Sequence, residues 1–135
     1  MMKKSWVKSV LLAGVMTTAA ACAPVGGTAY HKIDAEAAKT MLDQETGIVL
    51  VDVRRPDEYA QGHIPGAINI PNEIIGTAAQ DALPDKEATL VVYCRSGVRS
   101  RQASGKLVDM GYRAVYDMGG IIHWPYDTVK GDGAE

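Results

Sequence analysis

The 135-residue sequence contains only two cysteines, Cys22 and Cys94, and three histidines, His31, His63 and His123. Two cysteines cannot build a disulfide framework, and Cys94 has no resolving partner if Cys22 is modified. The histidines lack the spacing of metal ligands, and no glycine-rich phosphate loop of the nucleotide-binding kind occurs. The sequence therefore predicts neither a metal site nor a cofactor.

The chain also lacks a broad basic face. Its formal net charge is -2, and the first 21 residues carry three lysines and no acid, so residues 22–135 hold 11 cations and 16 anions, a net charge of -5 (11 minus 16). Three of those 11 cations fall between positions 95 and 101. A local positive spot on an otherwise acidic domain suits a small anion and argues against nucleic-acid binding.

The N-terminal segment has the order of a secretory signal. A cationic start at residues 1–9 precedes an apolar stretch and the small residues 17–21, so we predict a signal peptide over residues 1–21 and export of the protein. A retained membrane anchor is the competing interpretation. The apolar stretch from Val10 to Ala21 has twelve residues, fewer than the roughly 18 to 20 needed to span a bilayer.

Cys22 follows three alanines at positions 19–21, and this site resembles the cleavage box of bacterial lipoproteins, in which the cysteine is lipidated. Ala19 departs from that pattern, which usually has leucine there, and an ordinary Ala-x-Ala peptidase site also explains the alanines. Residues 22–28 are therefore expected to form a lipidated or flexible linker. The protein would be periplasmic, or anchored to a bacterial membrane only through lipid on Cys22.

Short apolar runs alternate with helix-like segments over residues 29–130, which we predict to be one domain followed by a C-terminal tail at 131–135. Asp34 is expected to cap the first helix. The alternation predicts an α/β fold with a small, mostly parallel sheet of about five strands and helices on both faces. The expected strands are 48–53, 67–70, 89–93 and 114–116, and the expected helices are 35–44, a short one beginning in 54–60, 72–83 and 100–110.

Cys94 is the candidate nucleophile. It follows the apolar run 89–93, which has the composition of a buried parallel strand, and ligands of open α/β folds gather at the C-terminal ends of such strands. If a helix begins near Ser100, loop amides, the positive helix terminus, Arg95 and Arg99 all favour the thiolate. The alternative, a small buried hydrophobe, does not explain the neighbouring glycine and arginines.

Three stretches of the chain resemble single-domain rhodaneses, a family of sulfurtransferases, over about residues 29 to 127. The resemblance rests on Val51–Arg54 with Glu58-Tyr59 and Gly62–Ala67, on the loop Cys94–Ser100, and on Gly119-Gly120 with Trp124. Four residues separate Cys94 from Arg99. Tyrosine phosphatases and the rhodanese-related phosphatases and arsenate reductases use a loop one residue longer, which has room for a tetrahedral oxyanion. The resemblance therefore implies a rhodanese-like fold and sulfur transfer.

The resemblance also implies a mechanism. Cys94 would take sulfane sulfur from thiosulfate, polysulfide or a similar anion, become a persulfide, and pass the sulfur to cyanide or a thiol. The outer sulfur would be held by the loop amides, with Arg95 and Arg99 orienting the donor. The loop residues expected to bind substrate are Arg95, Ser96, Gly97, Val98, Arg99 and Ser100.

Five further residues of the motifs are expected to support the structure: Asp52, Arg54, Glu58, His63 and Trp124. His63 could act as a general base, but its place in a Gly-His-Ile-Pro-Gly turn favours a structural role. Two other functions stay open. A non-turnover sulfur carrier or redox-sensing module would hand the persulfide to a protein partner, and a phosphatase or arsenate reductase is disfavoured by the short loop.

Overall fold

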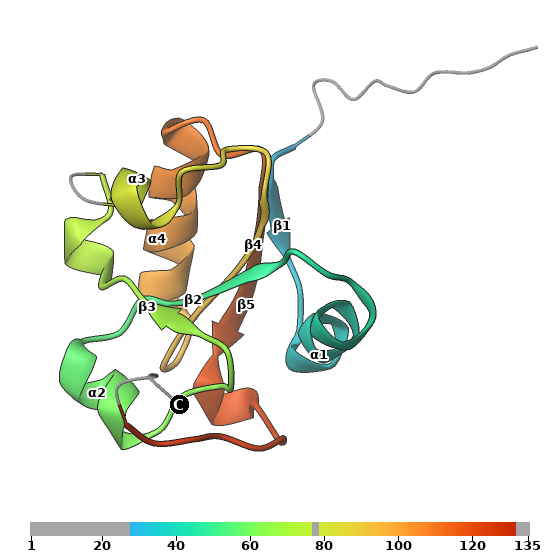
Figure 1. Cartoon of the computed structure of the whole chain (residues 1–135), viewed down its shortest axis with the longest axis vertical. Helices are drawn as coiled ribbons and strands as arrows, with labels where there is room; N and C mark the ends of the chain where they lie inside the picture. Colours follow the sequence, from blue (N-terminus) through green and yellow to red (C-terminus); the bar gives the residue numbers. More distant parts are fainter. Residues whose placement is uncertain (1–27, 77–78, 132–135) are drawn as a thin grey trace, which may run out of the picture.

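The computed structural model describes residues 28–76 and 79–131, which form one five-stranded sheet with helices packed around it (Figure 1). The strand order is β1-β5-β4-β2-β3, and every neighbouring pair is parallel. The predicted α/β class and parallel sheet are therefore confirmed. The strands are β1 (Tyr30–Lys32), β2 (Val49–Asp52), β3 (Ile68–Asn69), β4 (Thr89–Cys94) and β5 (Ala114–Gly120).

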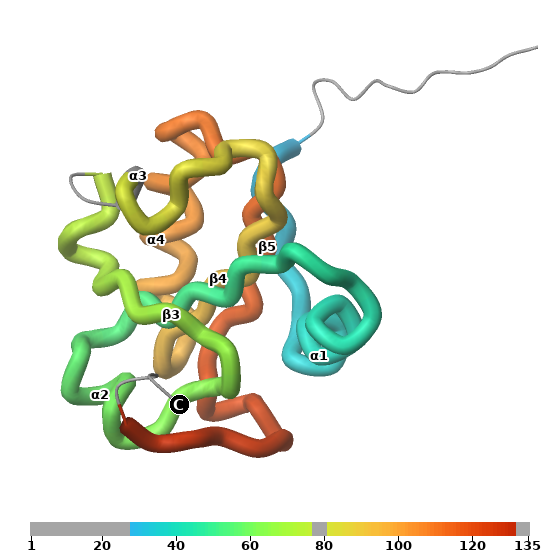
Figure 2. The backbone as a smooth tube through the Cα atoms, in the orientation of Figure 1, coloured from blue at the N-terminus to red at the C-terminus, as the bar shows by residue number. Residues whose placement is uncertain are grey.

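Helices cover both faces of the sheet. In Figures 1 and 2, α1 (Ala35–Gln44) lies on one side of the strands, and α3 (Ala79–Ala82) and α4 (Val98–Asp109) lie on the other. Because successive side chains of a strand point to opposite faces, β4 supplies both cores. Val92 and Cys94 pack with the α4 side, whereas Val91 and Tyr93 pack with the α1 side.

The predicted ends of the first helix agree with the structure. The Asp34 carboxylate accepts a hydrogen bond of 2.8 Å from the Ala37 amide, so it satisfies one of the free N–H groups at the start of α1.

Helix α2 (Pro56–Gln61) follows β2 and has proline in its first turn, as expected. Its Glu58 side chain accepts a hydrogen bond from the Arg55 amide, which fixes the entry into the helix.

The structure differs from three sequence expectations about secondary structure and adds one strand that was not located. The expected helix at 72–83 is interrupted, with a 3-10 turn at Asn72–Ile74 and helix α3 only from Ala79. Helix α4 begins at Val98 instead of near Ser100, and β5 continues to Gly120 instead of ending at Tyr116. Strand β1 was not predicted, since three residues carry too little periodicity and its pairing partner, β5, is distant in sequence.

Among residues 28–76 and 79–131, none of the helices has the length and apolar character to cross a membrane. The predicted signal peptide, Cys22 and most of the predicted tail lie outside the described residues.

Candidate functional site

Cys94 is the last residue of β4, and its side chain is 1% exposed. The Gly97 amide donates a hydrogen bond to its Sγ, with 3.0 Å between nitrogen and sulfur. Gly97 has a φ of 118°, a conformation that L side chains rarely adopt, so this position of the loop favours glycine. Helix α4 begins at the next residue, so the sulfur lies close to the positive end of a 12-residue helix.

Two carbonyl groups of the loop accept hydrogen bonds from backbone amides outside it. The Arg95 carbonyl accepts a hydrogen bond of 3.2 Å from the Ile122 amide, and the Gly97 carbonyl accepts one of 3.2 Å from the Arg101 amide. A loop amide, the Gly97 N–H, thus faces the sulfur, while these two carbonyls are engaged elsewhere. Such an arrangement stabilises negative charge on sulfur.

The end of β5 packs against the backbone of the Cys94 loop. A Cβ atom added to Gly120 would lie 2.2 Å from the Arg95 carbonyl oxygen and 2.7 Å from the Ser96 Cα, closer than real Cβ contacts. Only glycine therefore allows the backbone of the loop to approach β5 this closely. The resemblance had singled out Gly119-Gly120, and the structure places Gly120 directly against the loop.

The Arg99 side chain is engaged in an ion pair with Glu58. Its guanidinium donates two hydrogen bonds to the Glu58 carboxylate, at 2.7 and 3.1 Å, and joins the end of the loop to α2. The hydrogen bond from Arg99 lowers the pKa of Glu58 to about 2, against the opposing effect of burial, and the same pair raises the pKa of Arg99. The structure thus brings Glu58 into contact with the loop, which the sequence did not show.

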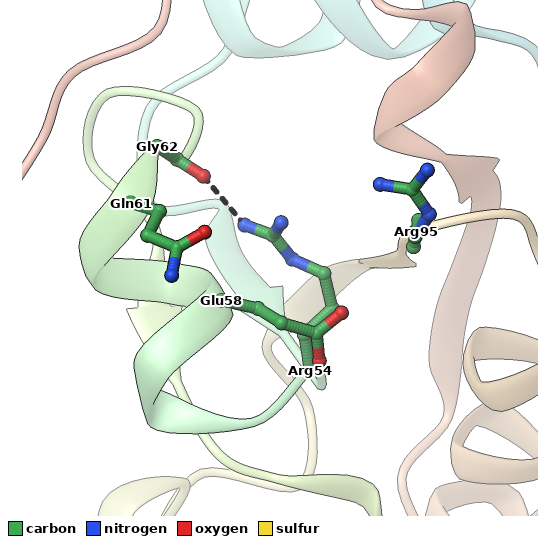
Figure 3. A pocket seen from close by; sticks show the side chains of 5 residues that line it. All are labelled: Arg54, Glu58, Gln61, Gly62 and Arg95. Atoms are coloured by element: carbon green, nitrogen blue, oxygen red, sulfur yellow. Dashed lines mark hydrogen bonds between the residues drawn. The ribbon is translucent and has the colours of Figure 1, made fainter.

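A small pocket of about 140 Å³ opens between α2 and the loop, lined by Arg54, Glu58, Gln61, Gly62 and Arg95. Figure 3 shows Arg54 and Arg95 on opposite sides of it. Arg54 is buried and paired with Asp52 at 2.6 Å, and it also donates a hydrogen bond of 2.7 Å to the Gly62 carbonyl. Within the described residues Arg95 makes no ion pair and is exposed, so it is the available cation of this pocket.

Asp117 is a residue beneath the loop that sequence reasoning missed. It lies on β5, is 1% exposed, and accepts hydrogen bonds from the Tyr30 hydroxyl at 2.8 Å, the Ser100 hydroxyl at 2.7 Å and the Gly119 amide at 2.9 Å. Burial and the hydrogen bond to Asp117 raise the pKa of Tyr30. An acidic residue inside an otherwise apolar last strand was the available signal, because buried carboxylates need partners.

The two remaining predicted support residues lie away from the loop amides. His63 is buried, stacks on the Tyr59 ring with centroids 3.8 Å apart, and has its Nδ1 2.9 Å from the Tyr59 carbonyl oxygen. Trp124 packs in the core on the α1 side of the sheet and donates a hydrogen bond of 3.1 Å from Nε1 to the Asp127 carbonyl. In the part of the chain that the structure describes, no group of three acidic, histidine or cysteine side chains is placed to hold a metal.

Comparison with known proteins agrees with this geometry. The profile of the rhodanese-like domain matches residues 34–125. A sulfurtransferase of Allochromatium vinosum is 40% identical over 95 residues, which cover 70% of this chain and 87% of that protein. The thiosulfate sulfurtransferase PspE of Escherichia coli is 43% identical over 81 residues, 60% of this chain and 78% of that protein. Among solved structures, a rhodanese from E. coli with anions has 42% identity and a TM-score of 0.59, covering 62% of this chain and 99% of that one.

Proposed function

Because the chain belongs to the rhodanese family and is a sulfurtransferase, we propose that it moves sulfane sulfur from thiosulfate or a related donor to cyanide or a thiol through a persulfide on Cys94. The observation that carries the proposal is the hydrogen bond of 3.0 Å from the Gly97 amide to Sγ at the start of α4. This contact places a backbone N–H donor on the sulfur atom that would carry the transferred sulfur.

In the first half-reaction the Cys94 thiolate attacks the outer sulfur of thiosulfate. A bond forms between Sγ and that sulfur, the S–S bond of thiosulfate breaks, and its electron pair leaves with sulfite. The outer sulfur then carries the negative charge and is held by the loop amides. In the second half-reaction the acceptor attacks the outer sulfur, and the electron pair of the broken S–S bond returns to Cys94.

The donor is oriented mainly by Arg95. The Arg99 guanidinium is bound to the Glu58 carboxylate, and this pair holds the loop against α2. Arg95 is exposed beside the small pocket, and Arg54 lies across from it. A pocket of about 140 Å³ with two guanidinium groups is suited to a small oxyanion. A related rhodanese from E. coli was solved with anions, which supports an anionic substrate.

The test is the intact mass of the purified protein after incubation with thiosulfate. We expect a gain of one sulfur atom that is absent from the Cys94→Ser variant and is lost on addition of cyanide. Steady-state kinetics should show the parallel lines of a ping-pong reaction, since the enzyme is modified between its two substrates. A wild-type protein that never gains sulfur would rule out the persulfide. Sulfur gain without turnover on cyanide or small thiols would instead indicate a carrier that serves a protein partner.

We also propose that the protein is exported and acts in the periplasm, with a lipid on Cys22 when the lipoprotein peptidase cleaves before it. The proposal rests on the charge and apolar order of residues 1–21 and on the alanines before Cys22. The mass of the mature N-terminus, taken from a bacterium that expresses the gene, tests it. An uncleaved N-terminus contradicts export through a cleaved signal, and an unmodified cysteine contradicts lipidation.

A further inference from the structure

A second recess adjoins the Cys94 loop. It is a groove of about 450 Å³. The residues that line it include Lys32, Ser96, Gly97, Val98, Arg101 and Asp117. None of them lines the small pocket beside Arg95. The loop therefore borders two recesses, with Arg95 in the small one and residues 96–98 in the larger one.

The exposed charge of this groove is positive. Lys32 and Arg101 are exposed and, among the described residues, make no ion pair, on a domain in which anions outnumber cations by 16 to 11 over residues 22–135. Asp117 also reaches the groove, but it is 1% exposed and its oxygens accept the three hydrogen bonds from Tyr30, Ser100 and Gly119. The groove thus exposes two cations, whereas its one carboxylate is buried and bound to three hydrogen-bond donors.

The groove also offers an apolar surface of suitable size. Val98 is 66% exposed at its edge, which is high for an aliphatic side chain. A volume of about 450 Å³ lies in the range of small-molecule sites, which combine apolar walls with a few polar groups. A small organic molecule that carries a carboxylate would match both features.

We propose that this groove binds the carboxylate of a small thiol that serves as the sulfur acceptor, an inference that rests on the proposed function. Lys32 and Arg101 pair with the carboxylate, and the aliphatic part of the acceptor lies on Val98. Gly97 lines the groove, and its amide nitrogen is 3.0 Å from the Cys94 Sγ. An acceptor bound in the groove would therefore contact a residue that is itself in contact with the sulfur. Donor and acceptor then have separate recesses on the same loop.

The transfer step needs no further reagent. The acceptor thiolate attacks the outer sulfur of the Cys94 persulfide, and a new S–S bond forms between them. The bond from that sulfur to Sγ breaks, its electron pair stays on Cys94 as the thiolate, and the acceptor leaves as a persulfide. The carboxylate takes no part in the chemistry, so its contribution is to binding and orientation.

The experiment compares two acceptors that differ only in the charged group, 3-mercaptopropionate and 3-mercaptopropionamide, with thiosulfate as donor. The readout is the ratio of kcat/KM for the two acceptors, with transfer to cyanide as the reference rate of each variant. In the Lys32→Gln/Arg101→Gln double variant, we expect the preference for the carboxylate to fall about three- to tenfold, the size expected for a partly exposed carboxylate–cation contact. Arg113→Gln/Lys130→Gln is the matched control, because it removes two exposed cations that do not line the groove.

Two results would overturn the inference. One is an unchanged ratio in the Lys32→Gln/Arg101→Gln variant; the other is an equal fall in Arg113→Gln/Lys130→Gln, which would indicate an effect of overall charge alone. If the wild-type protein transfers no sulfur from thiosulfate to cyanide, the proposed function fails instead. Binding of 3-mercaptopropionate, followed by NMR shifts of backbone amides, then decides whether the groove is a site: shifts at Lys32, Val98 and Arg101 support it, and shifts confined to other residues refute it.

Discussion

At the scale of single residues, Asp117 illustrates how one buried side chain organises a reactive loop. It connects β1, β5 and α4 through Tyr30, Gly119 and Ser100, and the Ser100 hydroxyl also lies 3.1 Å from the Gly97 carbonyl. Gly97 in turn donates to the Cys94 sulfur. The carboxylate thus holds Ser100, in the first turn of the helix that follows the Cys94 loop, and we regard it as a positioning residue.

We predict that Asp117→Ala lowers the free energy of unfolding by on the order of 3 kcal/mol, because three donors lose a charged, buried acceptor. Urea unfolding measures this, and the rate of Cys94 alkylation as a function of pH reports the state of the thiol. Tyr30→Phe removes one donor only, so about 1 kcal/mol is expected. Wild-type stability and an unchanged alkylation profile in Asp117→Ala would contradict the positioning role.

At the scale of elements, the site depends on how closely the loop approaches the end of β5. We predict that Gly120→Ala displaces the loop and costs about 1–3 kcal/mol of stability, because its Cβ would meet the Arg95 carbonyl oxygen at 2.2 Å. Persulfide formation from thiosulfate should slow as well, since the Gly97 amide moves with the loop. Chemical unfolding and stopped-flow kinetics measure the two effects.

Gly105→Ala is the control for this prediction. Gly105 lies within α4, and a Cβ there meets nothing within 4 Å. Alanine favours the helix over glycine, so we expect a gain of about 0.5–1 kcal/mol and an unchanged sulfur-transfer rate. If the two substitutions behave alike, close packing against β5 is not what holds the loop.

At the scale of the whole molecule, the pair Glu58–Arg99 couples acid stability to the integrity of the site. The pKa of Glu58 falls from its ordinary 4.5 to about 2 on folding, mainly because Arg99 donates to it. Between these values Glu58 binds more protons in the unfolded chain than in the folded one. The contribution of the Glu58–Arg99 pair to the free energy of unfolding is therefore complete above pH 4.5 and decreases as the pH falls toward 2. The side chains are 16% and 27% exposed, and we expect the loss to be on the order of 2–3 kcal/mol.

Unfolding free energies at a series of pH values test this prediction, with Glu58→Gln expected to flatten the decrease. Glu87→Gln serves as the control, because the Glu87–Arg113 pair spans 3.4 Å and is largely exposed. A pH curve that is the same in wild-type protein and Glu58→Gln would show that the pair is not the source of the acid sensitivity.

Local pattern alone determined several features of this protein: the Asp34 cap, the alternation of strands and helices, the position of Cys94 at a strand end, and the family. These are readable because hydrogen bonds and apolar periodicity within a few residues produce them. The short strand β1 and the interruption at 72–83 were not readable, since both depend on packing against distant segments.

The tertiary structure decided which charges are available at the site. In the sequence Arg95 and Arg99 look equivalent, but Glu58, 41 residues away from Arg99, neutralises one and leaves the other exposed. It likewise placed Asp117 beneath the loop and Lys32 beside it, because parallel pairing sets Lys32 of β1 opposite Asp117 of β5, toward the end of the sheet where Cys94 lies. Such contacts join residues far apart in the chain, and only the packed fold chooses among the partners that charge and size would allow.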